Sequence, residues 1–263
     1  PPLKRRSGGM ASWAEVYVRQ RVSGAYKIND LFATPDLNLL DTGYKALPFW
    51  LFFDTRQRDG TGNLPIRDYL MSYEASGDDK ATLAEIVASE WSANPPFDQV
   101  DNFFALFARE RRTGLWRRSQ SGADPFPTIR GPDDAVLAPA LAVTNVPMGA
   151  GDLYSVKDIV AGLGADYYAL SFASDCDGLT LTLSLVLETA TEFSCFLVWE
   201  KSGAMVSSDF VMLNSLSHSI QRVIDLSRCD GVVLAICGRS LGGRYGFKAQ
   251  ITAPLNWAWP AIA

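Results

Sequence analysis

The serine most suggestive of catalysis lies in the sequence GRSLG at residues 238–242, which matches the G-x-S-x-G pattern of hydrolase nucleophiles. In those enzymes the serine ends a strand and begins a helix, and a histidine later in the chain accepts its proton. Here the residues after Gly242 alternate like a second strand, and the single histidine, His218, precedes the serine. We therefore predict that Ser240 is a hairpin residue, and we assign no catalytic residue in this chain.

The single histidine also limits metal chemistry. A zinc-peptidase motif H-E-x-x-H requires two histidines, so His218 cannot form one within this chain. Asp59 with Asp68, and Asp175 with Asp177, offer carboxylates that suit calcium, but neither pair follows the twelve-residue EF-hand loop. We predict that both acidic clusters are solvated turns and that this chain holds no metal or cofactor by itself.

All four cysteines lie in the C-terminal half of the chain, at Cys176, Cys195, Cys229 and Cys237. An even number of cysteines suits the disulfides of a secreted domain, and four cysteines allow three pairings. Buried free thiols, which behave as small apolar residues, explain the same positions equally well. Both alternatives stay open, whereas the lack of paired C-x-x-C spacings excludes a zinc ribbon.

The elements that carry these candidates read as strands. Leucine occupies every second position from Leu179 to Leu187, which puts one face of a strand in a core because successive side chains point to opposite faces. Similar segments recur at short intervals at residues 165–173, 192–201, 205–213, 218–226, 231–239 and 244–253. We predict an antiparallel β-sandwich of seven or eight strands, either jelly-roll or immunoglobulin-like.

The N-terminal half predicts about five helices. Apolar side chains recur at helical spacing in residues 10–22, 44–58, 66–76, 79–91 and 97–112. Residues 23–43 mix turn formers with leucines, which predicts an ordered loop with short helical turns. Pro48 either kinks the second helix or marks its first turn.

A stretch rich in proline, glycine and serine separates the two halves. We predict an α+β chain with a helical domain at residues 1–114, a packed linker at 115–151 and a β-sandwich domain at 152–263. The composition is that of a globular protein, with 48% hydrophobic and 20% charged residues. The basic runs at 4–6 and 109–118 lie at a terminus and a helix end, and the net charge is −5, so nucleic-acid binding is not expected.

No apolar run is long enough to span a membrane, and the first residues lack the apolar core of a signal peptide. The chain begins at Pro1 without methionine. We therefore interpret residue 1 as a boundary left by processing or truncation, before which upstream sequence, with any export signal, can be missing from the chain.

Two segments of the helical half resemble the middle of secreted zinc metallopeptidases of the gluzincin type. In that family a helix with the pattern E-G-x-A-x-W-A-E follows the H-E-x-x-H helix, and a buried aromatic helix comes after it. The first pattern is matched by Gly9, Ala11, Trp13, Ala14 and Glu15, and the aromatic helix by Tyr44, Phe49, Trp50 and Leu51. The five helices and a trailing β-sandwich are also what several such secreted bacterial peptidases carry.

Two departures bear on activity. Gly8 stands where the family has its metal-ligand glutamate, and the histidine helix is missing. Because zinc catalysis needs three protein ligands and an activated water, this chain alone is not expected to hydrolyse peptides by that route. Zinc would bind only if sequence before Pro1 supplied the ligands, and that missing subdomain would be the chain's partner.

Three functions therefore compete. The first is a non-catalytic fragment or degenerate relative of a secreted bacterial metallopeptidase-like protein with an accessory sandwich. The second is an extracellular binding or adhesion protein that recognises a sugar or a protein. Tyr167, Tyr168 and Trp199 could form a sugar platform, although core packing explains aromatic side chains on strands at least as well. The third is an enzyme that uses unpaired carboxylates. The first two imply a location outside the cell or in the cell envelope.

Overall fold

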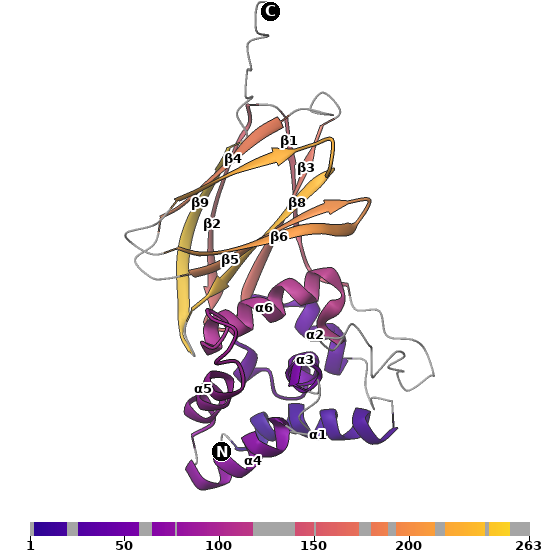
Figure 1. The fold of residues 1–263 in the computed structure, drawn as a ribbon, viewed down its shortest axis with the longest axis vertical. Helices are drawn as coiled ribbons and strands as arrows, with labels where there is room; N and C mark the ends of the chain where they lie inside the picture. Colours follow the sequence, from indigo (N-terminus) through magenta and orange to yellow (C-terminus); the bar gives the residue numbers. More distant parts are fainter. Residues whose placement is uncertain are drawn as a thin grey trace, which may run out of the picture. The chain divides into compact units, whose positions relative to one another are not determined.

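The computed structural model describes the chain at residues 3–19, 26–57, 65–76, 78–117, 140–149, 151–173, 180–188, 193–213, 219–239 and 242–252 (Figure 1). These residues form two compact units. The helical unit comprises Pro1–Ala142, Ala161–Ala165 and Arg239–Gly243, and the sandwich unit comprises Val143–Val160, Asp166–Gly238 and Arg244–Ala263. The α+β class with a helical part and a β part is confirmed.

The described part of the helical unit contains six α-helices and three short 3-10 helices. The α-helices are α1 Leu3–Arg19, α2 Tyr26–Ala33, α3 Leu47–Gln57, α4 Pro65–Ser76, α5 Asp79–Glu90 and α6 Val100–Thr113. The 3-10 helices are η1 Leu39–Asp41, η2 Gly43–Ala46 and η3 Leu115–Arg117. The five predicted helices are present, and the predicted loop with helical turns contains α2, η1 and the first residue of η2.

Helix α3 forms the centre of the helical unit. It begins at Leu47, so Pro48 lies in its first turn, where the missing amide proton costs no hydrogen bond. Phe49 and Phe52 are at most 1% exposed and meet Phe107 of α6 with ring centroids 5.4 and 5.2 Å apart. Such tilted and edge-on aromatic pairs add specific geometry to the burial of apolar area.

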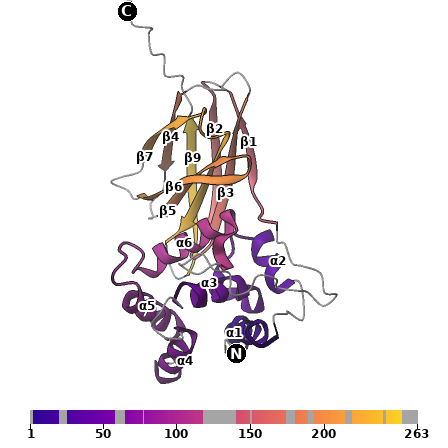
Figure 2. The same ribbon diagram turned by 45° about the vertical axis from the view of Figure 1, so that its right-hand side comes forward.

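The described residues of the β part form nine strands. They are β1 Thr144–Met148, β2 Leu153–Ala161, β3 Ala165–Phe172, β4 Thr180–Glu188, β5 Phe193–Lys201, β6 Ala204–Leu213, β7 Ser219–Asp225, β8 Gly231–Gly238 and β9 Arg244–Thr252. One sheet has the order β1-β3-β8-β5-β6 and the other β2-β9-β4-β7. Strands β4 and β9 run antiparallel side by side in both ribbon views (Figures 1 and 2).

The prediction of a purely antiparallel sandwich is wrong in one respect. Strand β1 pairs with β3 in parallel, with Thr144 opposite Tyr168. A parallel pair needs a connection that crosses over, and here β2 of the other sheet lies between the two strands along the chain. Neither β1 nor β2 belongs to the set of strands that sequence alternation predicts.

Among the leucines predicted to face the core, Leu185 is the one whose burial the structure describes, and it confirms the prediction. Leu185 is fully buried and stands opposite Ile220 of β7 and Ile251 of β9, which are also buried. Leu197 of β5 and Ile236 of β8, from the other sheet, belong to the same cluster. The two sheets therefore share one apolar core, as expected of a sandwich.

Candidate functional site

The residues of the peptidase-like pattern are engaged in contacts inside the helical unit. Gly8 and Gly9 lie within α1, and Ala11 is exposed. Trp13 donates its indole N–H to Asp54 Oδ2 of α3 at 3.1 Å, and the carboxylate of Glu15 lies 2.8 Å from Lys27 Nζ. These polar groups join α1 to α2 and α3, so their observed contacts are structural.

The fold also brings the second part of the pattern close to the first. Lys27 Nζ, paired with Glu15, lies 5.4 Å from the centroid of the Tyr44 ring. Phe49 and Trp50, next along the pattern, are buried in the same unit. The two segments that resemble the peptidase family thus pack together, as two helices of one core would.

The described residues contain no group of three or more histidine, cysteine, aspartate or glutamate side chains that could hold a metal ion. Asp68 forms an exposed ion pair with Arg67, with Nη2 and Oδ1 3.1 Å apart. His218, Asp59 and the aspartates at 175 and 177 lie outside the described residues, so the expectations for them stay predictions.

The G-x-S-x-G sequence lies between two strands. Strand β8 ends at Gly238 and β9 begins at Arg244, so the strand-to-helix context of a hydrolase nucleophile is missing. The two strands belong to different sheets, so their connection crosses from one sheet to the other and the prediction of a hairpin is wrong. Ser240 itself lies outside the described residues. The side chain of Arg239 donates to Gln99 Oε1 at 3.2 Å, and its Nε lies 3.7 Å from Asp101 Oδ2.

Cys195, Cys229 and Cys237 are buried free thiols. Cys195 stands opposite Ile236, the neighbour of Cys237, so alternation points the thiols of Cys195 and Cys237 to opposite faces of the sheet and they cannot bridge. The Cys229 thiol donates to the backbone oxygen of Asp225 at 3.4 Å. The buried-thiol alternative therefore holds for these three cysteines, and Cys176 lies outside the described residues.

Burial also determines how reactive these thiols are. It raises the pKa of the Cys195 thiol well above its ordinary value, with Cys237 adding to the shift. Burial likewise raises the pKa of Cys229, and the carboxylates of Asp225 and Asp230 add to the effect. Because the thiolate is the nucleophile, neither thiol is suited to covalent or redox catalysis at neutral pH.

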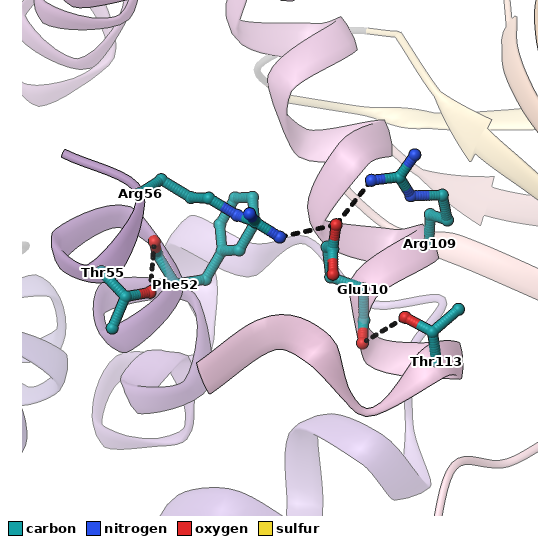
Figure 3. A network of polar contacts seen from close by, with 6 residues as sticks. All are labelled: Phe52, Thr55, Arg56, Arg109, Glu110 and Thr113. Atoms are coloured by element: carbon teal, nitrogen blue, oxygen red, sulfur yellow. Dashed lines mark hydrogen bonds and ion pairs between the residues drawn. The ribbon is translucent and has the colours of Figure 1, made fainter. Parts of the chain in front are cut away.

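A buried ion network, which the sequence reasoning missed, connects α3 to α6 (Figure 3). Glu110 is 1% exposed, and its Oε1 lies 2.6 Å from Arg56 Nη2 and 2.5 Å from Arg109 Nη2. The Arg56 guanidinium also lies 5.4 Å from the centre of the Phe52 ring. Its sequence signal is a glutamate between arginines on a helix whose other side chains are mostly apolar. These ion pairs hold α6 against α3. Because the Glu110 side chain is buried, the structure describes no open cleft at its carboxylate.

We predict that Glu110→Gln lowers the free energy of unfolding by about 3 kcal/mol, because it leaves two guanidinium groups without their buried counter-charge. Urea unfolding followed by circular dichroism at 222 nm measures the change. Arg67→Gln, which breaks the exposed pair with Asp68, is the matched control and should cost at most about 1 kcal/mol. Equal effects of the two substitutions would show that the network contributes no more than a surface pair.

Of the two explanations for the aromatic side chains on the strands, core packing holds for Tyr167 and Tyr168. Tyr167 is 3% exposed and Tyr168 is 1% exposed, while Trp199 packs against the sandwich core. The hydroxyl of Tyr168 donates to Asp158 Oδ2 at 3.2 Å. A stacking platform requires an exposed ring face, which neither tyrosine offers.

Tyr168 makes the stability of the chain depend on alkaline pH. Burial raises the pKa of its phenol above the ordinary 10.0, and the charges of Asp166 and Asp158 raise it further. The folded chain thus keeps a proton that the unfolded chain loses above about pH 10. The stabilisation is complete below pH 10 and is lost as the pH rises above it.

We predict that Tyr168→Phe is less stable than the unsubstituted chain at pH 7 by about 1 kcal/mol, the value of a typical hydrogen bond. This difference should shrink between pH 10 and pH 11, because phenylalanine has no proton to lose. Thermal unfolding of both proteins at several pH values tests this. A difference that stays constant to pH 11 would contradict the role of the Tyr168 proton.

A row of exposed apolar side chains follows β6, the last strand in its sheet order. The exposed fractions are 37% for Met205, 54% for Val206 and 42% for Met212. Phe210 is half-buried, and its ring lies 5.0 Å from that of Phe196 on β5. We call Met205, Val206, Phe210 and Met212 the β6 strip.

The register explains why Phe210 and Met212 face outward, and it shifts between Trp199 and Glu200, so that Glu200 stands opposite Met205 and Val206 has no partner in the register. Val211 stands opposite Cys195 and Asp209 opposite Leu197, and Cys195 and Leu197 belong to the core between the sheets. Phe210 and Met212 therefore lie on the other face. On the core side, Asp209 is paired with Arg222 of β7, which links the two sheets at this end of the sandwich.

Comparison with protein-family models and with curated proteins finds no match. Among solved structures, the periplasmic inhibitor of g-type lysozyme from Aeromonas hydrophila is 13% identical over 42% of this chain and 96% of that chain, with a TM-score of 0.30. The Yersinia pseudotuberculosis-derived mitogen is 8% identical over 43% of this chain and 92% of that chain, with a TM-score of 0.29. At these TM-scores the likenesses say nothing about function. No described helix is long and apolar enough to cross a membrane.

Proposed function

We propose that this chain is a non-enzymatic binding protein that recognises a protein partner through the β6 strip, outside the cell or in the cell envelope. The observation that carries the proposal is the exposure of Met205 and Val206 next to each other, with Met212 exposed further along the same strand. Neighbouring exposed apolar side chains on a soluble domain are typical of interaction surfaces.

The chemistry of the strip favours a protein over a sugar. Sugar recognition on a sandwich uses exposed aromatic ring faces, and Tyr167 and Tyr168 are buried. Methionine is flexible and polarisable, and it is enriched where protein surfaces meet. The apolar side chains of Met205, Val206 and Met212 suit the apolar centre of a protein interface.

The surroundings of the strip supply a polar rim. Ser208, which lies opposite Val198 on the same face as Phe210, is half-buried, and Ser207 of the same strand is exposed. Interfaces combine an apolar centre with polar groups at the periphery that fix orientation. We expect these hydroxyl groups to border the interface and the strip to supply most of the affinity.

One observation favours a second candidate, a degenerate relative of secreted metallopeptidases. Trp13 and Glu15 of the first motif contact the same helical core as Phe49 and Trp50 of the second. In that case the helical unit is the remnant of a peptidase lobe, and zinc ligands would come from sequence before Pro1. An H-E-x-x-H motif encoded there would support this candidate, and a complete upstream sequence without it would end it.

We predict that a photo-crosslinking amino acid at position 206, in the full chain expressed in its own cells, forms a discrete adduct with another protein. The matched control is position 223, because Val223 on β7 is 64% exposed and lies in the other sheet. Adducts are detected by their mass on a denaturing gel and identified by mass spectrometry. Adducts of equal yield at 206 and 223, or at neither, would contradict binding through the β6 strip.

A further inference from the structure

Two short segments from late in the chain belong to the helical unit. Residues 161–165 connect β2 to β3, and residues 239–243 connect β8 to β9. Each segment therefore belongs to a unit whose last described helix, η3, ends at Arg117. This division predicts that the helices need these two segments to reach their native state.

The first segment is bound to the chain between α2 and η1 through its backbone. Ala161 N–H donates to Asp36 O at 3.0 Å, and Ala165 N–H donates to Pro35 O at 2.8 Å. In return, Leu39 N–H donates to Leu163 O at 3.3 Å. These three backbone hydrogen bonds join residues more than 120 positions apart in the sequence and hold the first segment against residues 35–39.

Close packing makes this contact specific. Leu163 is 1% exposed, although its φ of 53° is unfavourable for a side chain with a Cβ. A Cβ on Gly164 would lie 2.3 Å from the backbone oxygen of Asp36 and 3.0 Å from that of Ala161. Only glycine fits at position 164, because backbone atoms on both sides cannot move away cheaply.

The second segment is attached to the first and to α6. Gly162 N–H donates to Gly243 O at 3.0 Å. Arg239 donates to Gln99 Oε1 at 3.2 Å, just before the first turn of α6, and its Nε lies 3.7 Å from Asp101 Oδ2 within that turn. The two segments thus contact the helical sequence at two distant places, residues 35–39 after α2 and the start of α6.

We infer that residues 161–165, together with Arg239 and Gly243, form a clasp that completes the helical unit, so that α2, η1 and the first turn of α6 keep their native protection only while the clasp is in place. In this account the helices depend on residues that follow them in the sequence. The clasp acts through backbone hydrogen bonds, packing and the Arg239 side chain, independently of the proposed binding function.

Hydrogen exchange on the full chain tests the clasp. Gly164→Ala crowds Asp36, whereas Gly246→Ala is the matched control, because a Cβ there approaches nothing closer than 3.9 Å. We expect amides of residues 26–41 to exchange at least about tenfold faster in Gly164→Ala and at unchanged rates in Gly246→Ala. Unchanged rates at residues 26–41 in a folded Gly164→Ala chain would overturn the inference.

A milder variant covers the second segment and does not crowd the backbone. Arg239→Gln removes the bond to Gln99 and the ion pair with Asp101. We expect amide exchange to accelerate in residues 99–104 by roughly three- to tenfold while the amides of β5 stay protected. Acceleration spread evenly over the whole chain, or none at residues 99–104, would contradict a local clasp.

Discussion

The alternation of side chains across the two sheets is the constraint on which the sandwich depends. Each residue that faces the core, such as Leu185 or Leu197, sets its neighbours on the opposite face. The same rule keeps the thiols of Cys195 and Cys237 apart and turns Phe210 and Met212 away from the core. The candidate binding surface is thus a consequence of the register between β5 and β6.

The helical unit depends on a different interaction. Its core is dense in phenylalanine, and a buried carboxylate, Glu110, is held between two guanidinium groups at its margin. Apolar packing alone does not fix the rotation of one helix against another, whereas a buried ion pair with defined partners penalises every other register. Arg56 takes part in both the aromatic core and the ion network, because its guanidinium contacts the Phe52 ring and the Glu110 carboxylate.

The sequence allowed much of the fold to be predicted, because its periodic patterns are strong. The leucine alternation of β4 and the phenylalanine stripe of α6 point to a strand and a helix without ambiguity. Strand β2 was not predicted, because most of its side chains are exposed and its sequence lacks the apolar alternation of a half-buried strand. Strand β1 was not predicted, because it has only five residues and one of them is Pro147, a residue type that argues against a strand.

The site was harder to predict than the fold, since it depends on contacts between distant residues. Tyr167 and Tyr168 are neighbours on opposite faces of β3, and a sequence does not say that both faces are covered. The partners of Glu110 and the bonds from Asp36 to Ala161 join segments far apart in the chain. Local patterns carry no information on such pairs. The peptidase resemblance stays a prediction, because the H-E-x-x-H residues that would decide it are not in this chain.

The central claim is that the β6 strip is covered by a protein partner, and methionine oxidation measures this directly. Oxidation follows exposure, and Met71 on α4, which is 63% exposed, serves as an internal reference. In the purified chain, Met205, Met212 and Met71 should all be oxidised by peroxide. In cells that express the full protein, the account predicts protection of Met205 and Met212 but not of Met71. Equal oxidation of all three in cells would contradict it.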